Sequence, residues 1–231
     1  MLEMLKEKVC EANKMIQKNN LGVLSWGNAS ERDVETGLIV IKPSGVAFSD
    51  LKPNDMVVVD INGKVVEGNL NPSSDTPTHL EIYSKHPEIR GICHTHSQHA
   101  TAWAQGDKSL DCFGTTHADH FYGSIPLTRS LTLDEIKTNY ELNTGVVINE
   151  TFVGKNVLDC PGIFVKNHGP FTFGIDSLDA VTNSLILEFI CGLAFETLAI
   201  NPNKTQIEKH LMEKHFFRKH GPNSYYGQKK K

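Results

Sequence analysis

The alternation of hydrophobic and polar residues predicts that helices and strands follow one another irregularly. Apolar positions three and four residues apart predict an amphipathic helix over residues 2–16. Short β-branched runs predict strands over 23–26, 38–41, 56–60, 64–67, 89–96, 162–166 and 171–173, with a hairpin at Asn62-Gly63. Further helices are expected over 77–85, after the capping box Thr132–Glu135, over 176–200 and over 204–219. This order favours a single-domain α/β fold with a mixed central β-sheet between helical layers.

Composition narrows the class of protein. The 231 residues fit one large domain, and 39% of them are hydrophobic, which is enough for a substantial core. With a net charge of −4, no broad surface for nucleic acid or membranes is expected. Charges interrupt the first twenty residues and no long apolar run follows, so we expect neither a targeting signal nor a membrane-spanning helix. Five scattered cysteines favour reduced thiols in a cytoplasmic protein.

His94-Thr95-His96 is the most informative chemical signal in the chain. Residues two apart in a strand face the same side, so both imidazoles would point to one place, and Cys93 would face the core. The spacing alone is weak, because the chain has 11 histidines and a strand histidine is commonly a hydrogen-bonded core residue. Catalytic zinc typically takes three protein ligands and keeps an open position. His168 is the natural third nitrogen, and Asp75 is a candidate carboxylate.

Three Gly/Ser elements could bind a phosphate through free amides and hydroxyls: Gly27-Asn28, Ser44-Gly45 and Ser73-Ser74. Taken singly, each of them is more often an ordinary turn. A metal beside a phosphate site suggests a sugar phosphate, whose carbon–carbon chemistry next to a ketone also needs acid/base groups. Asp119 is one candidate, and Tyr226 is another unless it only packs near the C-terminus.

Short motifs keep their order and spacing along the chain: Trp26–Ser30, Ile41–Val46, Pro72–His79, His94–Ser97, Gly114–Asp119, Ser124–Pro126, His168–Phe171, Arg218–Gly221 and Tyr225–Gln228. Together they resemble the class II aldolase/epimerase family, and within it the sugar-phosphate epimerases. The resemblance covers residues 1–228 and leaves 229–231 as a basic C-terminal tail. It implies a three-layer α/β/α domain and a homotetramer with active sites at subunit interfaces.

The resemblance also implies roles for individual residues. Zn²⁺ would be held by His94, His96 and His168, with Asp75 at the metal. The substrate phosphate would be bound by Gly27, Asn28, Ser44, Gly45, Ser73 and Ser74. Asp119 and Tyr226 would be the acid/base pair, while Lys42 and His215 lie in matching active-site segments.

The implied reaction interconverts L-ribulose 5-phosphate and D-xylulose 5-phosphate. The C3–C4 bond would break by retro-aldol cleavage, glycolaldehyde phosphate would rotate, and aldol addition to a metal-bound enediolate would reform the bond. One alternative is an aldolase that releases both fragments, such as L-fuculose-phosphate aldolase, although such relatives usually carry Glu where Asp75 stands. The other is a non-catalytic scaffold, which would be expected to lose metal ligands.

Overall fold

The central sheet has seven strands in the order β4-β3-β2-β1-β5-β7-β6. The computed structural model describes residues 2–228, so the predicted basic tail 229–231 lies outside the described residues. The strands are β1 (Asn28–Arg32), β2 (Ile39–Ile41), β3 (Val57–Val59), β4 (Val65–Glu67), β5 (Gly91–His94), β6 (Gly162–Val165) and β7 (Gly169–Gly174). Every pairing between these strands is antiparallel. The α/β prediction is therefore confirmed, while the mixed strand orientation is wrong.

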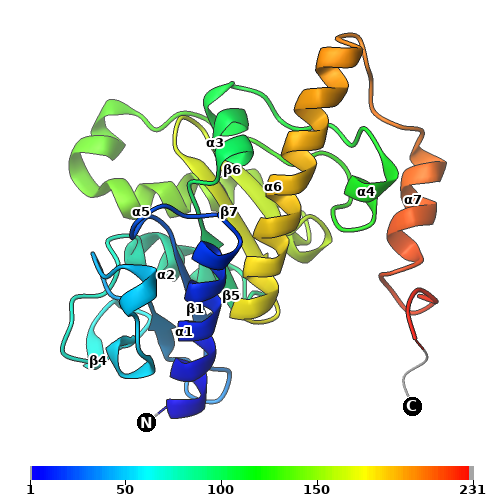
Figure 1. Cartoon of the computed structure of the whole chain (residues 1–231). Helices are drawn as coiled ribbons and strands as arrows, with labels where there is room; N and C mark the ends of the chain where they lie inside the picture. Colours follow the sequence, from blue (N-terminus) through cyan, green and yellow to red (C-terminus); the bar gives the residue numbers. More distant parts are fainter. Residues whose placement is uncertain (1, 229–231) are drawn as a thin grey trace.

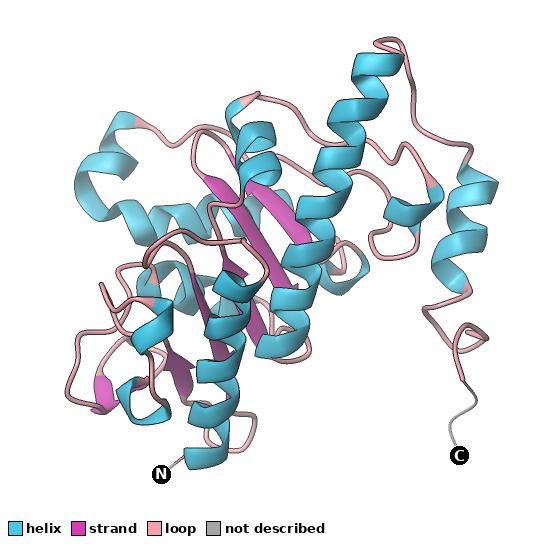
Figure 2. Cartoon of the chain, in the orientation of Figure 1, coloured by secondary structure: helices cyan, strands magenta, loops and turns pink. Residues whose placement is uncertain are grey.

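Helices cover both faces of the sheet, which makes three layers (Figures 1 and 2). The helices are α1 (Glu3–Lys18), α2 (Thr76–Lys85), α3 (Gln98–Gln105), α4 (Thr115–Ala118), α5 (Leu133–Thr151), α6 (Ser177–Ile200) and α7 (Lys209–Phe217), with short 3₁₀ turns at Phe48–Asp50, Pro53–Asp55 and Val157–Asp159. One core cluster joins α2 and α5 to the sheet. Two others join α1, α3 and α6 to its opposite face. Alternating strand residues thus serve both cores.

Several local predictions are confirmed. Asn62-Gly63 connects β3 and β4 as an antiparallel hairpin. Thr132 and Glu135 form the expected capping box at the start of α5. Asp176 caps α6 by accepting a hydrogen bond from the Asp179 amide.

Other local predictions are wrong. Residues 23–26 form a turn instead of a strand, with Leu24 at a φ of 56° and the Trp26 amide bonded to the Val23 carbonyl. The strand expected over 89–96 ends at His94, and the last helix begins at Lys209 rather than at 204. α3 and α4 are additional to the predicted helices. Each difference lies where a turn or a loop, rather than hydrophobic periodicity, sets the backbone.

By length and composition alone, helix α6 could cross a membrane, although the sequence was not expected to contain such an apolar run. In the structure it packs against β5, β7, α1 and α3, as a core helix does. Its outer side nevertheless exposes Leu185, Phe189 and Leu193, which follow one another at intervals of four residues on one face of the helix. This apolar strip is therefore available to another protein surface.

Helices α4 and α7 form a small unit at one edge of the molecule, beyond α6 (Figure 1). Cys112, Ala118 and Met212 form its buried core. The unit is built from segments about a hundred residues apart in sequence, and it carries the side chains around Asp119 described below.

Candidate metal and substrate site

Three imidazoles converge at one end of the central strands. His94 ends β5, His96 follows two residues later, and His168 lies in the turn between β6 and β7. Their potential ligand nitrogens all lie within 4.8 Å of one another. The Nε2 atoms of His94 and His96 are 3.1 Å apart. Because β5 ends at His94, strand alternation alone does not orient His96, although the predicted convergence occurs.

The ring nitrogens of His94 have distinct environments. Nδ1 lies 2.9 Å from the Pro170 carbonyl oxygen, which can only accept, so Nδ1 donates and the Nε2 lone pair faces His96. Burial lowers the pKa of His96 to about 4 and that of His168 to about 3, with neighbouring His94 adding to both shifts. Near neutral pH these two rings are uncharged. A borderline divalent cation such as Zn²⁺ fits this donor set.

Asp75 lies beside the triad at the N-terminus of α2. Its Oδ2 accepts a hydrogen bond of 2.6 Å from the Asn28 side-chain amide, which also donates to the Ser73 hydroxyl. Burial alone would raise the pKa of Asp75, but the neighbouring His94 and His79 and the Asn28 hydrogen bond outweigh it and hold that pKa below its ordinary value. An ionised carboxylate therefore faces the imidazoles, where it could contribute to metal binding.

One open cavity of about 670 Å³ contains the triad and the predicted phosphate-binding residues. Its lining residues are Ser25, Trp26, Gly27, Asn28, Lys42, Pro43, Ser44, Gly45, Ser73, Ser74, Asp75, His94, His96, Tyr140, Glu141 and His168. The three Gly/Ser elements are thus neighbours in space although they come from separate parts of the sequence. Their shared cavity favours a binding role over three unrelated turns.

Backbone contacts hold these loops together. The Ser44 amide donates to the Asn71 carbonyl, and the Ser73 amide donates to the Lys42 carbonyl. Gly27 has a φ of +93°, and a Cβ there would lie 2.7 Å from the His94 carbonyl oxygen. Only glycine therefore allows this loop to pass so close to the triad.

Lys42 is the cation of the cavity. Its side chain is buried, and Nζ donates to the carbonyl oxygens of Ser25 and Pro43. Burial lowers the pKa of Lys42 to about 8, although Asp75 opposes the shift. The ammonium form therefore still predominates at pH 7, and it can attract an anion such as a phosphate.

The predicted acid/base residues are not brought to this cavity. Asp119 caps the end of α4, where it binds Arg218 through both oxygens and also accepts from His215 Nδ1 at 3.0 Å. Tyr226 lies against Arg218, whose guanidinium carbon is 5.1 Å from the ring centre. Burial would raise the pKa of Asp119, but Arg218, His215 and Lys219 lower it to about 2. Asp119, His215 and Tyr226 thus form one cluster in the α4–α7 unit, apart from the triad.

Sequence reasoning missed five cavity residues: Ser25, Trp26, Pro43, Tyr140 and Glu141. Trp26 lies edge-on to His96, with ring centres 6.4 Å apart. The Tyr140 hydroxyl is 3.4 Å from His168 Nδ1, and Glu141 follows it on α5. Burial raises the pKa of the Tyr140 phenol, and Asp75 adds to the rise. No local signal marks Tyr140 or Glu141, because both lie within a stretch with ordinary helical composition.

Comparison with known proteins identifies the family. Residues 7–195 match the Class II Aldolase and Adducin N-terminal domain. The chain belongs to the class II aldolase family. Members of this family use a divalent metal, bind sugar phosphates and are often oligomeric.

Solved structures of the same fold agree with this assignment. An L-fuculose 1-phosphate aldolase superposes with a TM-score of 0.79 at 24% identity, covering 93% of this chain and 95% of its own. The L-fuculose 1-phosphate aldolase from Glaciozyma antarctica PI12 gives 0.75 at 23% identity, covering 93% and 80% respectively. YgbL from Escherichia coli, described as an aldolase, epimerase or decarboxylase, gives 0.73 at 20% identity, covering 92% and 97%. At these identities the likeness concerns the fold alone.

Proposed function

We propose that this class II aldolase family member is a zinc-dependent, cytoplasmic L-ribulose-5-phosphate 4-epimerase. The observation that carries the proposal is the shared cavity, which joins three convergent imidazoles and Asp75 to the Gly/Ser loops and Lys42. A ligand that spans it needs an anionic end and a pair of oxygens for a metal. A ketose phosphate has both. The five cysteines, all free and buried, support a reducing compartment.

His94, His96 and His168 would hold the metal, together with Asp75. When bound, a divalent metal supplies Lewis-acid stabilisation for the negative charge that develops on a ketone oxygen during carbon–carbon cleavage. Lys42 and the Ser44-Gly45 and Ser73-Ser74 loops would bind the phosphate. They would thereby keep the phosphorylated fragment in the cavity while its aldehyde group rotates to present its other face.

Asp119 and Tyr226 would move protons at the C4 oxygen, one on each side of the substrate. Arg218 keeps Asp119 in the ionised form that a proton acceptor needs, and the Tyr226 phenol would be the donor. Since their cluster lies apart from the cavity of the same chain, a second copy would have to supply them. The exposed apolar strip on α6 supports such association. We propose a homotetramer with sites at the subunit interfaces.

Product analysis tests the proposal. Purified protein loaded with Zn²⁺ is incubated with L-ribulose 5-phosphate, with and without a chelator, and the pentulose phosphates are separated. The expected product is D-xylulose 5-phosphate, formed only without the chelator. Stoichiometric free dihydroxyacetone would instead identify an aldolase. A protein that binds no metal and converts no sugar phosphate would be a scaffold.

A further inference from the structure

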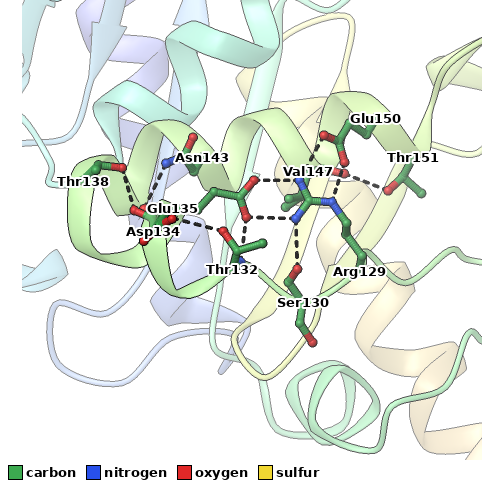
Figure 3. A network of polar contacts seen from close by, with 10 residues as sticks. All are labelled: Arg129, Ser130, Thr132, Asp134, Glu135, Thr138, Asn143, Val147, Glu150 and Thr151. Atoms are coloured by element: carbon green, nitrogen blue, oxygen red, sulfur yellow. Dashed lines mark hydrogen bonds and ion pairs between the residues drawn. The ribbon is translucent and has the colours of Figure 1, made fainter.

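The helix along one wall of the cavity folds back on itself. α5 is interrupted at Asn139, whose φ of −144° and ψ of 72° are not helical. The Arg129 guanidinium binds Glu135 before the break and Glu150 after it, each at 2.7 Å (Figure 3). In a straight helix those two glutamates would lie about 22 Å apart. One guanidinium can join them only because the chain reverses at Asn139.

The second half of α5 is fixed against α2. A Cβ on Gly145 would lie 2.9 Å from the Thr78 carbonyl oxygen, so the two helices are in close contact there. The Thr78 hydroxyl donates to the Glu141 carbonyl, and the Asn149 amide donates to the Glu81 carbonyl. α2 also carries Asp75 at its N-terminus. The residue directly after the break, Tyr140, is therefore held in register with the proposed metal site.

Tyr140 directs its hydroxyl at the third imidazole. The hydroxyl oxygen lies 3.4 Å from His168 Nδ1, at the outer limit of a hydrogen bond, and the ring centres are 6.1 Å apart. The corresponding nitrogen of His94 has a backbone acceptor, the Pro170 carbonyl. Histidine ligands generally donate their second N–H to such an acceptor, which fixes the tautomer and the ring orientation.

We propose that Tyr140 is a positioning residue for His168. Its hydroxyl accepts the Nδ1–H of His168, which turns Nε2 toward His94 and His96. Arg129 acts through Tyr140, because it holds the two halves of α5 together and so keeps the break where Tyr140 faces the cavity. The inference rests on the proposed metal site and adds a group outside the ligand set.

Metal titration of the purified protein tests this role without an activity assay. Apo protein is titrated with Co²⁺, whose visible absorption reports both affinity and ligand geometry. Loss of an outer partner typically weakens binding by about 10-fold or more. We expect Tyr140→Phe to show such a loss and shifted absorption bands, with an unchanged melting temperature of the apo protein.

Tyr122→Phe is the matched control. Its hydroxyl donates to Glu213 in the α4–α7 unit, away from the cavity. The same chemical change there should leave Co²⁺ affinity and the absorption bands as in the wild type.

A double-mutant cycle tests the part played by Arg129. Arg129→Gln should weaken Co²⁺ binding by less than Tyr140→Phe does, and the double variant should bind as Tyr140→Phe alone. Wild-type affinity and bands in Tyr140→Phe would overturn the role of Tyr140. Additive losses in the double variant would overturn the coupling. A wild-type protein that binds no Co²⁺ would instead overturn the proposed metal site.

Discussion

At the scale of single residues, the three imidazoles differ in how the fold holds them. His94 is buried and tied to a backbone carbonyl, whereas His96 lies beyond the end of β5, where its Nε2 faces that of His94. We expect His96→Asn to lose bound Zn²⁺ and most turnover, since the amide replaces one of three nitrogen ligands. Zinc content and product formation measure the two losses. His99→Asn is the control: it changes a histidine three residues away that binds Glu188, and it should keep both the bound Zn²⁺ and the turnover of the wild type.

Buried histidines elsewhere make the metal-free fold sensitive to acid. Burial lowers the pKa of His79 to about 3 and that of His117 to about 4. Between pH 6.5 and 4 the unfolded chain binds protons at these positions and the folded chain does not, so the free energy of unfolding falls with pH. Between pH 7 and pH 5, each of these two histidines should lower the free energy of unfolding by about 2 kcal/mol. Urea unfolding of the apo protein at both pH values measures the loss.

His117→Gln provides the control for this pH dependence. His117 Nε2 donates to the Gly123 carbonyl, and the glutamine amide can make the same bond without titrating. The variant should lose about half of the pH-dependent difference that the two histidines cause. If the free energy of unfolding of the variant changes with pH as much as that of the wild type, the pH dependence arises from groups other than His117.

At the scale of elements, the contact between α2 and α5 leaves no room for a side chain at Gly145. Its Cβ would meet both Glu81 and the Thr78 carbonyl within 3 Å. We expect Gly145→Ala to destabilise the protein by about 1–3 kcal/mol, because backbone must move. A Cβ on Gly192 in α6 would come no nearer than 3.5 Å to its nearest neighbour, the His99 ring, so Gly192→Ala should be neutral or stabilising by up to about 1 kcal/mol. Thermal or urea unfolding separates them.

Elements with local signals could be predicted from the sequence. The β3–β4 hairpin follows from Asn62-Gly63, and the start of α5 follows from Thr132 and Glu135. The break at Asn139 could not be predicted, since it depends on Arg129 reaching two distant glutamates. The turn over residues 23–26 was also missed, because its residue types are those of a strand. In both cases tertiary contacts override the local pattern.

At the scale of the whole molecule, the two proposed halves of the active site lie apart in one chain. If a second copy completes each site, two defective proteins should restore each other. We expect His96→Asn and Asp119→Asn, each inactive alone, to regain about one quarter of wild-type activity after co-refolding in equal amounts, since one site in four then receives both intact halves. The His96→Asn variant refolded alone by the same procedure is the inactive control. No recovery would contradict shared sites.

From the sequence it was easier to predict which site residues lie close to one another than to predict that they form two separate groups. The triad and the Gly/Ser loops converge because β1 and β7 begin where β5 ends, at the same edge of the sheet. Asp119, His215 and Tyr226 also gather, yet around Arg218 and away from the triad. A single chain offers no signal that separates these two groups. In the proposed tetramer their relation would depend on a partner surface, which the pattern of one sequence does not encode.

The register between β1 and β5 places Asn28 beside the proposed metal site. Asn28 in β1 pairs directly with His94 in β5, so the amide that binds Asp75 is adjacent to an imidazole. A one-residue insertion or deletion in β1 after Ser30 would turn Asn28 to the opposite face of the sheet. Ser30, the buried partner of His79, would turn with it. Length variation in this strand should therefore be far less tolerated than in the β3–β4 turn, even where hydrophobicity is preserved.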